Sequence, residues 1–449
     1  MKLGMVAMSG VRAHNRELTE LGLTLPGFVE RNKTIASLPS LSLLTLAGMT
    51  PESVGVEYLE VPDLDVLNGP PGDFDAVAIA SYSAQIKEAY RLADGYRALG
   101  TRVVLGGLHV TAVQAEAMEH ADSVVLGEGE SVWPRVVADL LQGRLEKIYD
   151  ARDRRFDLAD APMPAFHLLD IGKYNRLTVQ TQRGCPWRCE FCAASIRISP
   201  TYKVKPIAKV VAEIRRIREL WPDPFIEFAD DNTFVHKEHS KKLMRALAGE
   251  RIRWFTETDV SVAEDDELLS LMHDGGCVQV LIGFESPSRA GLEGLEERAN
   301  WKARQLDRYA RAVDRIQDHG ITVNGCFILG LDGTGGESFD DVWRFARDTN
   351  LYEVQITVLT SFPGTPLYDR LRTEGRLLRE GAWELCTLFD VNFTPTHMSV
   401  SELEAGFRSL AEKLYSAAAT KERRDKFRKR WRNLHSTLPK TGTGGGMAR

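Results

Sequence analysis

The chain has 449 residues, of which 43% are hydrophobic and 27% charged, and its formal net charge is -6. These proportions are ordinary for a globular protein, and the length predicts two main domains with an extension rather than one core. The negative charge argues against general affinity for nucleic acid. The N-terminus lacks an apolar run long enough for a signal peptide, and no stretch is long and apolar enough to span a membrane, so we expect a cytoplasmic protein.

Residues 1–150 alternate short apolar runs with helical patterns, which is typical of a doubly wound parallel sheet. The expected strands are Lys2–Ala7, Val54–Val61, Asp75–Ser81, Arg102–Leu105 and Ser123–Leu126, with helices such as Ala84–Leu99 between them. Several strands end in small residues, namely Ser81, Ser83, Gly106, Gly107 and Gly127. Such residues let a ligand approach the backbone at the carboxyl ends of parallel strands, although glycine also ends many strands that bind nothing.

The usual nucleotide-binding patterns are missing from this first segment. No G-x-G-x-x-G follows the first strand, and the chain has no G-x-x-x-x-G-K-[ST]. Nucleotide binding in the Rossmann or P-loop manner is therefore disfavoured.

Residues 151–176 are expected to be a linker, because the prolines within Asp160–Ala165 bar a regular helix. Strands and helices then alternate again over residues 177–365. The expected strands are Leu177–Gln180, Phe225–Phe228, Arg253–Glu257, Val278–Gly283, Thr322–Leu329 and Glu353–Leu359. Helical patterns between them are Ile207–Leu220, Ser240–Ala248, Asp265–His273 and Trp301–His319. Six β/α units indicate a partial barrel whose chemistry lies at the carboxyl ends of its strands.

Three cysteines, Cys185, Cys189 and Cys192, follow the first of these strands at C-x-x-x-C-x-x-C spacing. Thiolates are the usual ligands of iron-sulfur clusters, which normally take four of them, so three close cysteines indicate one iron with an open position. A zinc knuckle is the alternative, but it normally needs a fourth Cys or His at short spacing. The nearest candidates are more distant, at His236 and His239.

The other cysteines, Cys277, Cys326 and Cys386, are isolated and sit in apolar patterns. Disulfides are rare in a reducing compartment, so buried thiols are the favoured interpretation.

Polar side chains follow the next three strands of the expected barrel. Asp231 follows the second strand, Thr258 the third and Glu285 the fourth. Carboxylates and hydroxyls there suit a ligand with an ammonium group and a ribose. Because such residues are also favoured caps and turn residues, a purely structural role remains the alternative.

With Phe191 just before its last cysteine, the triplet resembles the signature of the radical SAM superfamily. The resemblance implies that the three cysteines hold a [4Fe-4S] cluster whose fourth iron binds S-adenosyl-L-methionine (SAM). It implies that an electron from a flavodoxin- or ferredoxin-type donor then produces a 5'-deoxyadenosyl radical. It also implies contacts to SAM from Phe191, Asp231, Thr258 and Glu285.

Residues 1–150 resemble the cobalamin-binding domain that precedes the barrel in a large radical SAM subgroup. The matching segments are Pro39–Ala47, Ser81–Ser83, Gly106–Thr111 and Val125–Glu130. The D-x-H-x-x-G element that gives other cobalamin domains a histidine ligand has no counterpart at His14 or His109. The resemblance thus implies a cobalamin tail in the crevice and no histidine on the cobalt. The residues expected nearest to it are Ser81, Ser83, Gly106, Gly107 and Gly127.

A proline-rich turn ends the barrel, and helical patterns dominate residues 366–436, which we expect to form a helical C-terminal extension. Its segment Lys421–Arg432 is basic, with Phe427, Trp431 and Leu434 on one helical face. Such a helix can lie on a membrane, but packing on the barrel with a solvated basic face is the favoured interpretation. Residues 437–449 are glycine-rich at their centre and are expected to be disordered.

Over nearly its full length the chain resembles the cobalamin-dependent radical SAM methylases of hopanoids and menaquinones. The resemblance implies methyl transfer to an unactivated carbon of a small molecule, such as a lipid or a natural-product intermediate. One SAM would be the methyl source, through cobalamin, and another the radical source. Two alternatives remain. One is a radical SAM cyclisation, rearrangement or other SAM-derived group transfer in which the first domain is a scaffold, and the other is a non-catalytic iron-sulfur or cobalamin sensor.

Overall fold

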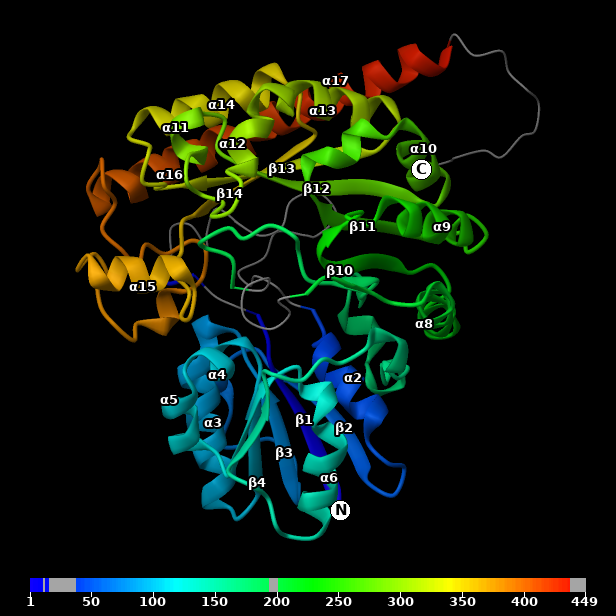
Figure 1. Ribbon diagram of the computed structural model, residues 1–449, viewed down its shortest axis with the longest axis vertical. Coiled ribbons are helices and arrows are strands. Elements are labelled where there is room, and N and C mark those ends of the chain that lie inside the picture. The colour runs from blue at the N-terminus through cyan, green and yellow to red at the C-terminus, as the bar shows by residue number, and fades with distance from the viewer. Residues whose placement is uncertain (11–12, 16–37, 194–200, 437–449) are drawn as a thin grey trace.

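The computed structural model describes residues 1–10, 13–15, 38–193 and 201–436. The expected disordered tail, 437–449, lies outside these residues. Two six-stranded parallel sheets dominate the fold, and the N-terminal sheet lies below the second sheet in Figure 1. The chain begins at the end of β1 that is farther from the second sheet (Figure 1). The carboxyl ends of these parallel strands therefore point toward the second sheet.

The N-terminal sheet has the strand order β2-β1-β3-β4-β5-β6. Its strands are β1 (Lys2–Met8), β2 (Gly55–Val61), β3 (Ala76–Ala80), β4 (Arg102–Gly106), β5 (Ser123–Gly127) and β6 (Ile148–Ala151). The five strands that the sequence predicts are all present. The sixth, β6, is an addition at the expected start of the linker, where four residues that include Asp150 are too few and too polar to give an apolar run.

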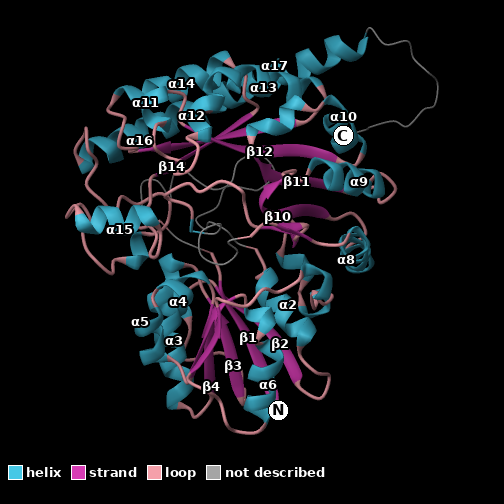
Figure 2. Ribbon diagram, viewed as in Figure 1, coloured by secondary structure: helices cyan, strands magenta, loops and turns pink. Residues whose placement is uncertain are grey.

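Helices cover both faces of this sheet (Figure 2). They are α2 (Leu41–Met49), α3 (Ile86–Ala98), α4 (Leu108–Ala112), α5 (Gln114–His120) and α6 (Trp133–Leu141). Alternate residues of a strand point to opposite faces, so Val77 and Ile79 pack in one apolar cluster while Ala76 and Ala78 pack in the other. Burial on both faces explains why the strands are continuous apolar runs rather than alternating patterns.

The second sheet has the order β14-β13-β12-β11-β10-β7. Its strands are β7 (Leu177–Val179), β10 (Phe225–Thr233), β11 (Arg253–Thr258), β12 (Cys277–Glu285), β13 (Thr322–Leu329) and β14 (Glu353–Val358). All neighbours are parallel, and within the described strands β7 and β14 remain edges that do not pair with each other. The α/β class and the partial barrel of six units are therefore confirmed.

Helices cover the outside of the barrel. They are α8 (Ile207–Leu220), α9 (Lys237–Leu247), α10 (Asp266–Asp274), α11 (Arg289–Leu292), α12 (Trp301–Gln305), α13 (Tyr309–Asp318) and α14 (Glu337–Asp348). The single helix expected over Trp301–His319 is wrong, because a 3-10 turn at Leu306–Arg308 separates α12 from α13. The short α12 buries Lys302, which is only 7% exposed.

The C-terminal extension contains α15 (Pro366–Thr373), α16 (Val400–Tyr415) and α17 (Ala417–Ser436). Residues 374–399 between them are mostly irregular and return to the N-terminal domain. There Trp383 is buried near α3, packs against His109 and donates from Nε1 to Glu116 at 3.0 Å. The extension thus contacts both domains.

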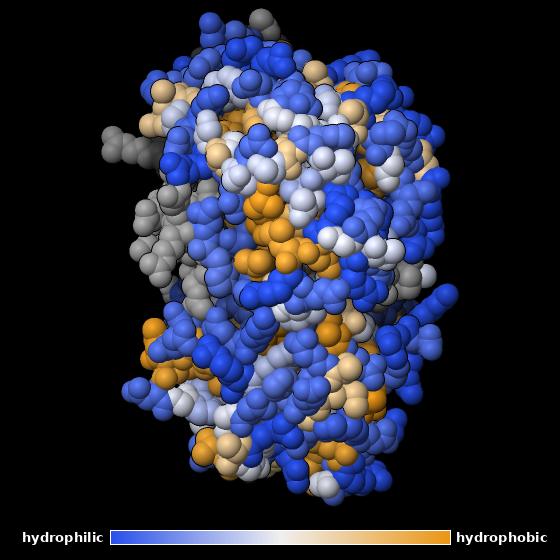
Figure 3. Space-filling view, turned by 90° about the vertical axis from the view of Figure 1, so that its left-hand side faces the viewer, coloured by the Kyte–Doolittle hydropathy of each residue, from blue (hydrophilic) through white to orange (hydrophobic). Residues whose placement is uncertain are grey.

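The basic helix α17 packs on the barrel, which is the interpretation that the sequence analysis favours over contact with a membrane. Arg430 forms ion pairs with Asp314 and Asp318 of α13, and Arg424 pairs with Glu353 of β14. Among the described helices none has the length and apolarity needed to cross a membrane. The face on the left side of Figure 1 is mostly hydrophilic, with hydrophobic residues in separate patches (Figure 3).

Candidate cofactor sites at the carboxyl ends of the two sheets

The three cysteines of the motif lie in the loop that follows β7 and the short strand β8 (Gln182–Arg183). Cys189 is buried, at 8% exposed, and Cys185 and Cys192 are partly buried. Burial raises the pKa of the Cys185 thiol to about 11, with a further contribution from Cys192. Burial also raises the pKa of Cys189, to which both other thiols contribute. The three thiols thus lie in one short loop, and each of Cys185 and Cys189 interacts electrostatically with Cys192.

The loop is held in place by polar side chains from the neighbouring barrel strands. Asp231 of β10 accepts a hydrogen bond from the backbone N of Gly184 at 2.6 Å, and Gly184 has a φ of 89° that favours glycine. Asn232 donates to the sulfur of Cys185 at 3.6 Å. The indole N of Trp187 donates to Asp259 at 3.0 Å. Of these residues only Asp231 was among the expected SAM contacts.

The far side of the loop is held by two glutamates. Glu296, at 2% exposed, accepts backbone N–H groups from Arg188, Arg298, Ala299 and Trp301. Burial alone would raise the pKa of this carboxyl, but these bonds hold it below its usual value. Glu190, inside the loop, pairs with Arg370 of α15 at 2.8 Å. The cysteine loop is therefore anchored from several elements.

Two of the expected SAM contacts already use their polar atoms within the protein. The hydroxyl of Thr258 donates to the carbonyl of Thr233 at 2.7 Å. Glu285, with a φ of 62°, forms an ion pair with the buried Lys302 at 2.8 Å. Phe191 is partly buried against the barrel core.

Glu257, which directly precedes Thr258, points the opposite way from it. Thr258 is 8% exposed, whereas the side chain of Glu257 touches open space. The pKa of Glu257 is raised to about 8. The largest cause is removal of the carboxyl from bulk water, and the negative charges of Glu227, Asp231 and Glu285 add to it. Trp254 and Thr256 share the face of Thr258 and are fully buried, so Glu257 lies on the opposite face of β11, toward the barrel interior. The unexpected charge at the end of an apolar strand was the available sequence signal.

The small residues at the edge of the N-terminal sheet have different surroundings. A side chain on Gly107, whose φ is 112°, would meet nothing within 4 Å, and one on Gly106 would touch only Val125, at 3.7 Å. A side chain on Gly127 would lie 2.9 Å from the backbone N of Arg152, so its own chain requires this glycine. The open space at Gly106 and Gly107 fits a large ligand that passes close to the backbone.

The hydroxyls at this edge are bonded locally. Ser81 donates to the carbonyl of Tyr82 at 2.9 Å, and Ser83 lies 3.0 Å from Nδ1 of His109. His109 is 1% exposed, packs edge-on against Trp383, and is held neutral because burial lowers its pKa to about 4. Its ring thus lies among buried aromatic side chains.

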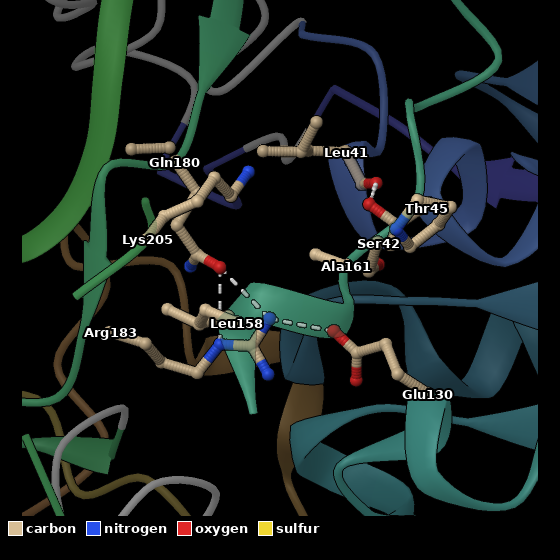
Figure 4. A pocket seen from close by; sticks show the side chains of 11 residues that line it. Leu41, Ser42, Thr45, Glu130, Leu158, Ala161, Gln180, Arg183 and Lys205 are labelled. Atoms are coloured by element: carbon tan, nitrogen blue, oxygen red, sulfur yellow. Dashed lines mark hydrogen bonds and ion pairs between the residues drawn. The ribbon is translucent and has the colours of Figure 1, made fainter. Parts of the chain in front are cut away.

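The two candidate sites are joined by an ion-pair network. Arg183, two residues before Cys185, pairs with Glu128 at 3.0 Å and Glu130 at 2.6 Å. Glu128, which follows Gly127, also pairs with Lys203 at 2.6 Å. Figure 4 shows Arg183 between Gln180 and Glu130, at a pocket that α2 lines from the other side.

No three Cys, His, Asp or Glu side chains in the described part of the chain gather where a single metal ion would sit. Three thiols suit a cluster of several irons.

Comparison with known proteins agrees with this arrangement. Residues 179–348 match the model of the radical SAM superfamily, and residues 39–137 match the B12 binding domain. An uncharacterized methyltransferase, sll1242 of Synechocystis, is 30% identical over 369 residues, which are 80% of this chain and 67% of that protein. The chain belongs to the radical SAM superfamily. Residues 365–443 of this radical SAM protein also match a domain of unknown function.

Two further relatives have named substrates. The bacteriochlorophyllide d C-12(1)-methyltransferase of Chlorobaculum tepidum is 27% identical, over 86% of this chain and 84% of its own. The hopanoid C-2 methylase of Rhodopseudomonas palustris is 25% identical, over 77% of this chain and 66% of its own. The expected resemblance to hopanoid methylases is thus confirmed.

A solved structure shares the whole fold. TsrM from Kitasatospora setae, with cobalamin and a [4Fe-4S] cluster bound, has a TM-score of 0.65 at 15% identity, and the match covers 93% of this chain and 89% of that chain. Membership in the radical SAM superfamily implies a [4Fe-4S] cluster and SAM, and the match to the B12 binding domain implies cobalamin. The expected cofactors are thus confirmed. This radical SAM protein is an enzyme, and the sensor alternative is not supported.

Proposed function

We propose that this radical SAM enzyme transfers a methyl group to an unactivated carbon of a small molecule. One observation carries the proposal: Arg183 beside the cysteine loop is bonded to Glu128 and Glu130, in the loop that follows β5 at the B12-domain edge. The loops proposed to hold the two cofactors therefore meet. When bound, the cofactors supply a carbon-centred radical and a transferable methyl group.

The residues of the chain hold these partners in line and keep water out. Cys185, Cys189 and Cys192 are proposed to ligate the cluster, with Asp231 and Asn232 fixing their loop. The pair Glu285–Lys302, buried beside Cys189, is proposed to border SAM. Gly106 and Gly107 are proposed to let cobalamin reach the backbone, where Ser81, Ser83 and Gly127 shape the same edge.

The named relatives support the reaction type rather than one substrate, because bacteriochlorophyllide and hopanoid differ greatly in shape and charge while both names describe methylation. We propose the same reaction on a substrate that fits the barrel interior of this chain. A flavodoxin- or ferredoxin-type protein is the proposed electron donor.

The test uses anaerobically reconstituted enzyme with SAM that carries a deuterated methyl group, a strong reductant and a metabolite extract. The expected result is a product with an added labelled methyl group, with S-adenosylhomocysteine and 5'-deoxyadenosine formed in roughly equal amounts. The Cys189→Ala variant is the control and should form neither product nor 5'-deoxyadenosine. Substrate turnover with 5'-deoxyadenosine but without S-adenosylhomocysteine would contradict the proposal and favour a rearrangement or another group transfer.

A further inference from the structure

The carboxylates that face or border the barrel interior differ in whether they have a partner. Glu227 pairs with Arg176 at 2.5 Å, Asp231 accepts the N–H of Gly184 at 2.6 Å, and Glu285 pairs with Lys302 at 2.8 Å. Asp230 is buried and accepts bonds from Thr181, Gln182 and Thr233. The carboxyl group of Glu257 has no hydrogen-bond or ion-pair partner among the described residues, whereas its backbone carbonyl accepts from Thr256. It is therefore the carboxylate left for a ligand.

The position of Glu257 is set by strand geometry. It pairs in register with Leu281 of β12, and its neighbours Thr256 and Thr258 are 0% and 8% exposed on the opposite face. Its carboxyl interacts electrostatically with Glu227 and Asp231 of β10 and Glu285 of β12, and with Cys326 of β13. Side chains from three neighbouring strands thus surround it.

The charge balance of this interior indicates what Glu257 needs. Burial, followed by the neighbouring carboxylates, raises the pKa of Glu257 to about 8. At pH 7 a carboxyl with this pKa is mostly protonated, and the protonated form is favoured over the ionised form by about tenfold. A cationic group at hydrogen-bond distance easily outweighs that factor. A neutral hydrocarbon would instead leave the carboxyl without a partner.

We propose that Glu257 recognises the substrate, and that the substrate presents a protonated nitrogen to it near the carbon that is methylated. The inference deepens the proposed function and rests on it for the reaction. SAM also carries positive charge, so the test must separate SAM from a second ligand.

The experiment measures binding to the unreduced holoenzyme, which contains cluster, cobalamin and SAM, so that no turnover is involved. The probes are 2-phenylethylammonium, its neutral analogue 2-phenylethanol and the anion 3-phenylpropionate. Calorimetry at pH 7 in two buffers of different ionisation enthalpy gives both affinity and proton release. The ammonium should bind at least about tenfold more tightly than the alcohol, with the anion weakest, and should release close to one proton because Glu257 ionises.

The variants assign this preference to one side chain. In Glu257→Gln the ammonium should lose its advantage over the alcohol and its proton release, whereas Glu257→Asp should keep part of both. Glu227→Gln is the matched comparison, because it removes a carboxyl that already has a partner and should keep most of the preference. Iron, cobalamin and SAM affinity should be unchanged in Glu257→Gln.

Three results would overturn the inference. The first is wild-type protein that does not prefer the ammonium, whether or not any probe binds. The second is a preference that survives in Glu257→Gln. The third is a tenfold loss of SAM affinity in that variant, which would assign the carboxyl to SAM. Because none of these measurements needs methyl transfer, failure of the proposed reaction would leave them unaffected.

Discussion

The two parallel sheets carry opposite chemistry at their carboxyl edges. At the N-terminal edge the open space beside Gly107 is flanked by neutral serines and glycines, and the glutamates of this edge, Glu128 and Glu130, are paired with Arg183. The barrel edge has carboxylates, most of which are satisfied by a cation or by backbone N–H groups, as Glu285 is by Lys302 and Asp231 by Gly184. A large cofactor held by its shape needs close backbone approach, whereas a small charged cofactor needs charged partners. The difference indicates which cofactor each edge suits.

The largest effect should come from the cysteine loop of the barrel. Cys189→Ala should reduce cluster iron and sulfide to background and abolish 5'-deoxyadenosine formation. When one of the four irons is open, each of the other three needs its own thiolate, so no cysteine of the triplet can be spared. The control is Cys277→Ala, which replaces a thiol that is 3% exposed in the barrel core and should cost about 1–2 kcal/mol of stability but keep the cluster. Full cluster occupancy in Cys189→Ala would contradict the assignment.

The open space at the neutral edge can be tested with two side chains at Gly107. Any side chain there should cost about 1–3 kcal/mol, because a φ of 112° with a ψ of -174° lies in a region essentially confined to glycine, so Gly107→Ala and Gly107→Leu should lose similar stability. Only the leucine should fill the crevice, and it should lower cobalamin affinity at least about tenfold relative to the alanine. Corrin absorbance after reconstitution measures this. Equal cobalamin binding by both variants would remove Gly107 from the site, and loss of the cluster would show a wider disturbance.

The contact between the two edges should contribute less. Arg183→Gln leaves Glu128 and Glu130 short of a charge partner, and their side chains are only 4% and 10% exposed. We expect a loss of about 2–3 kcal/mol in the free energy of unfolding, below the usual range for a broken buried pair because Lys203 still neutralises Glu128. The matched control is Arg372→Gln at an exposed pair with Asp369, which should cost at most about 0.5 kcal/mol. Similar losses in both would show that the edges are not coupled there.

The smallest effect concerns Glu257, whose carboxyl faces the barrel interior and has no partner among the described residues. Since the folded protein raises the pKa of Glu257 to about 8, it binds this proton more tightly than the unfolded chain does. Its contribution to stability is therefore complete below about pH 4.5 and is lost as the pH rises toward 8. In SAM-free protein the melting temperature should therefore fall more in wild type than in Glu257→Gln between pH 6 and pH 8. Parallel pH profiles would contradict this.

Much of the fold was visible in the sequence because its signals are local. Apolar runs and helical periods gave the strands of the barrel and five strands of the first sheet, and the cysteine spacing located the cluster loop. Short or polar elements were missed, as with Ile148–Ala151. The turn that divides α12 from α13 also gave no signal, since an amphipathic pattern continues across it.

The sequence by itself determined the class of the two domains, the three cysteines and the kinds of residue at the strand ends. Only the tertiary structure decided which of those residues face the barrel interior. Glu257 and Thr258 are adjacent in sequence, yet strand geometry turns one inward and the other toward the carbonyl of Thr233. The same holds for Arg183 and Glu128, 55 residues apart. Their contact depends on how the domains pack, and no local pattern records a contact between distant segments.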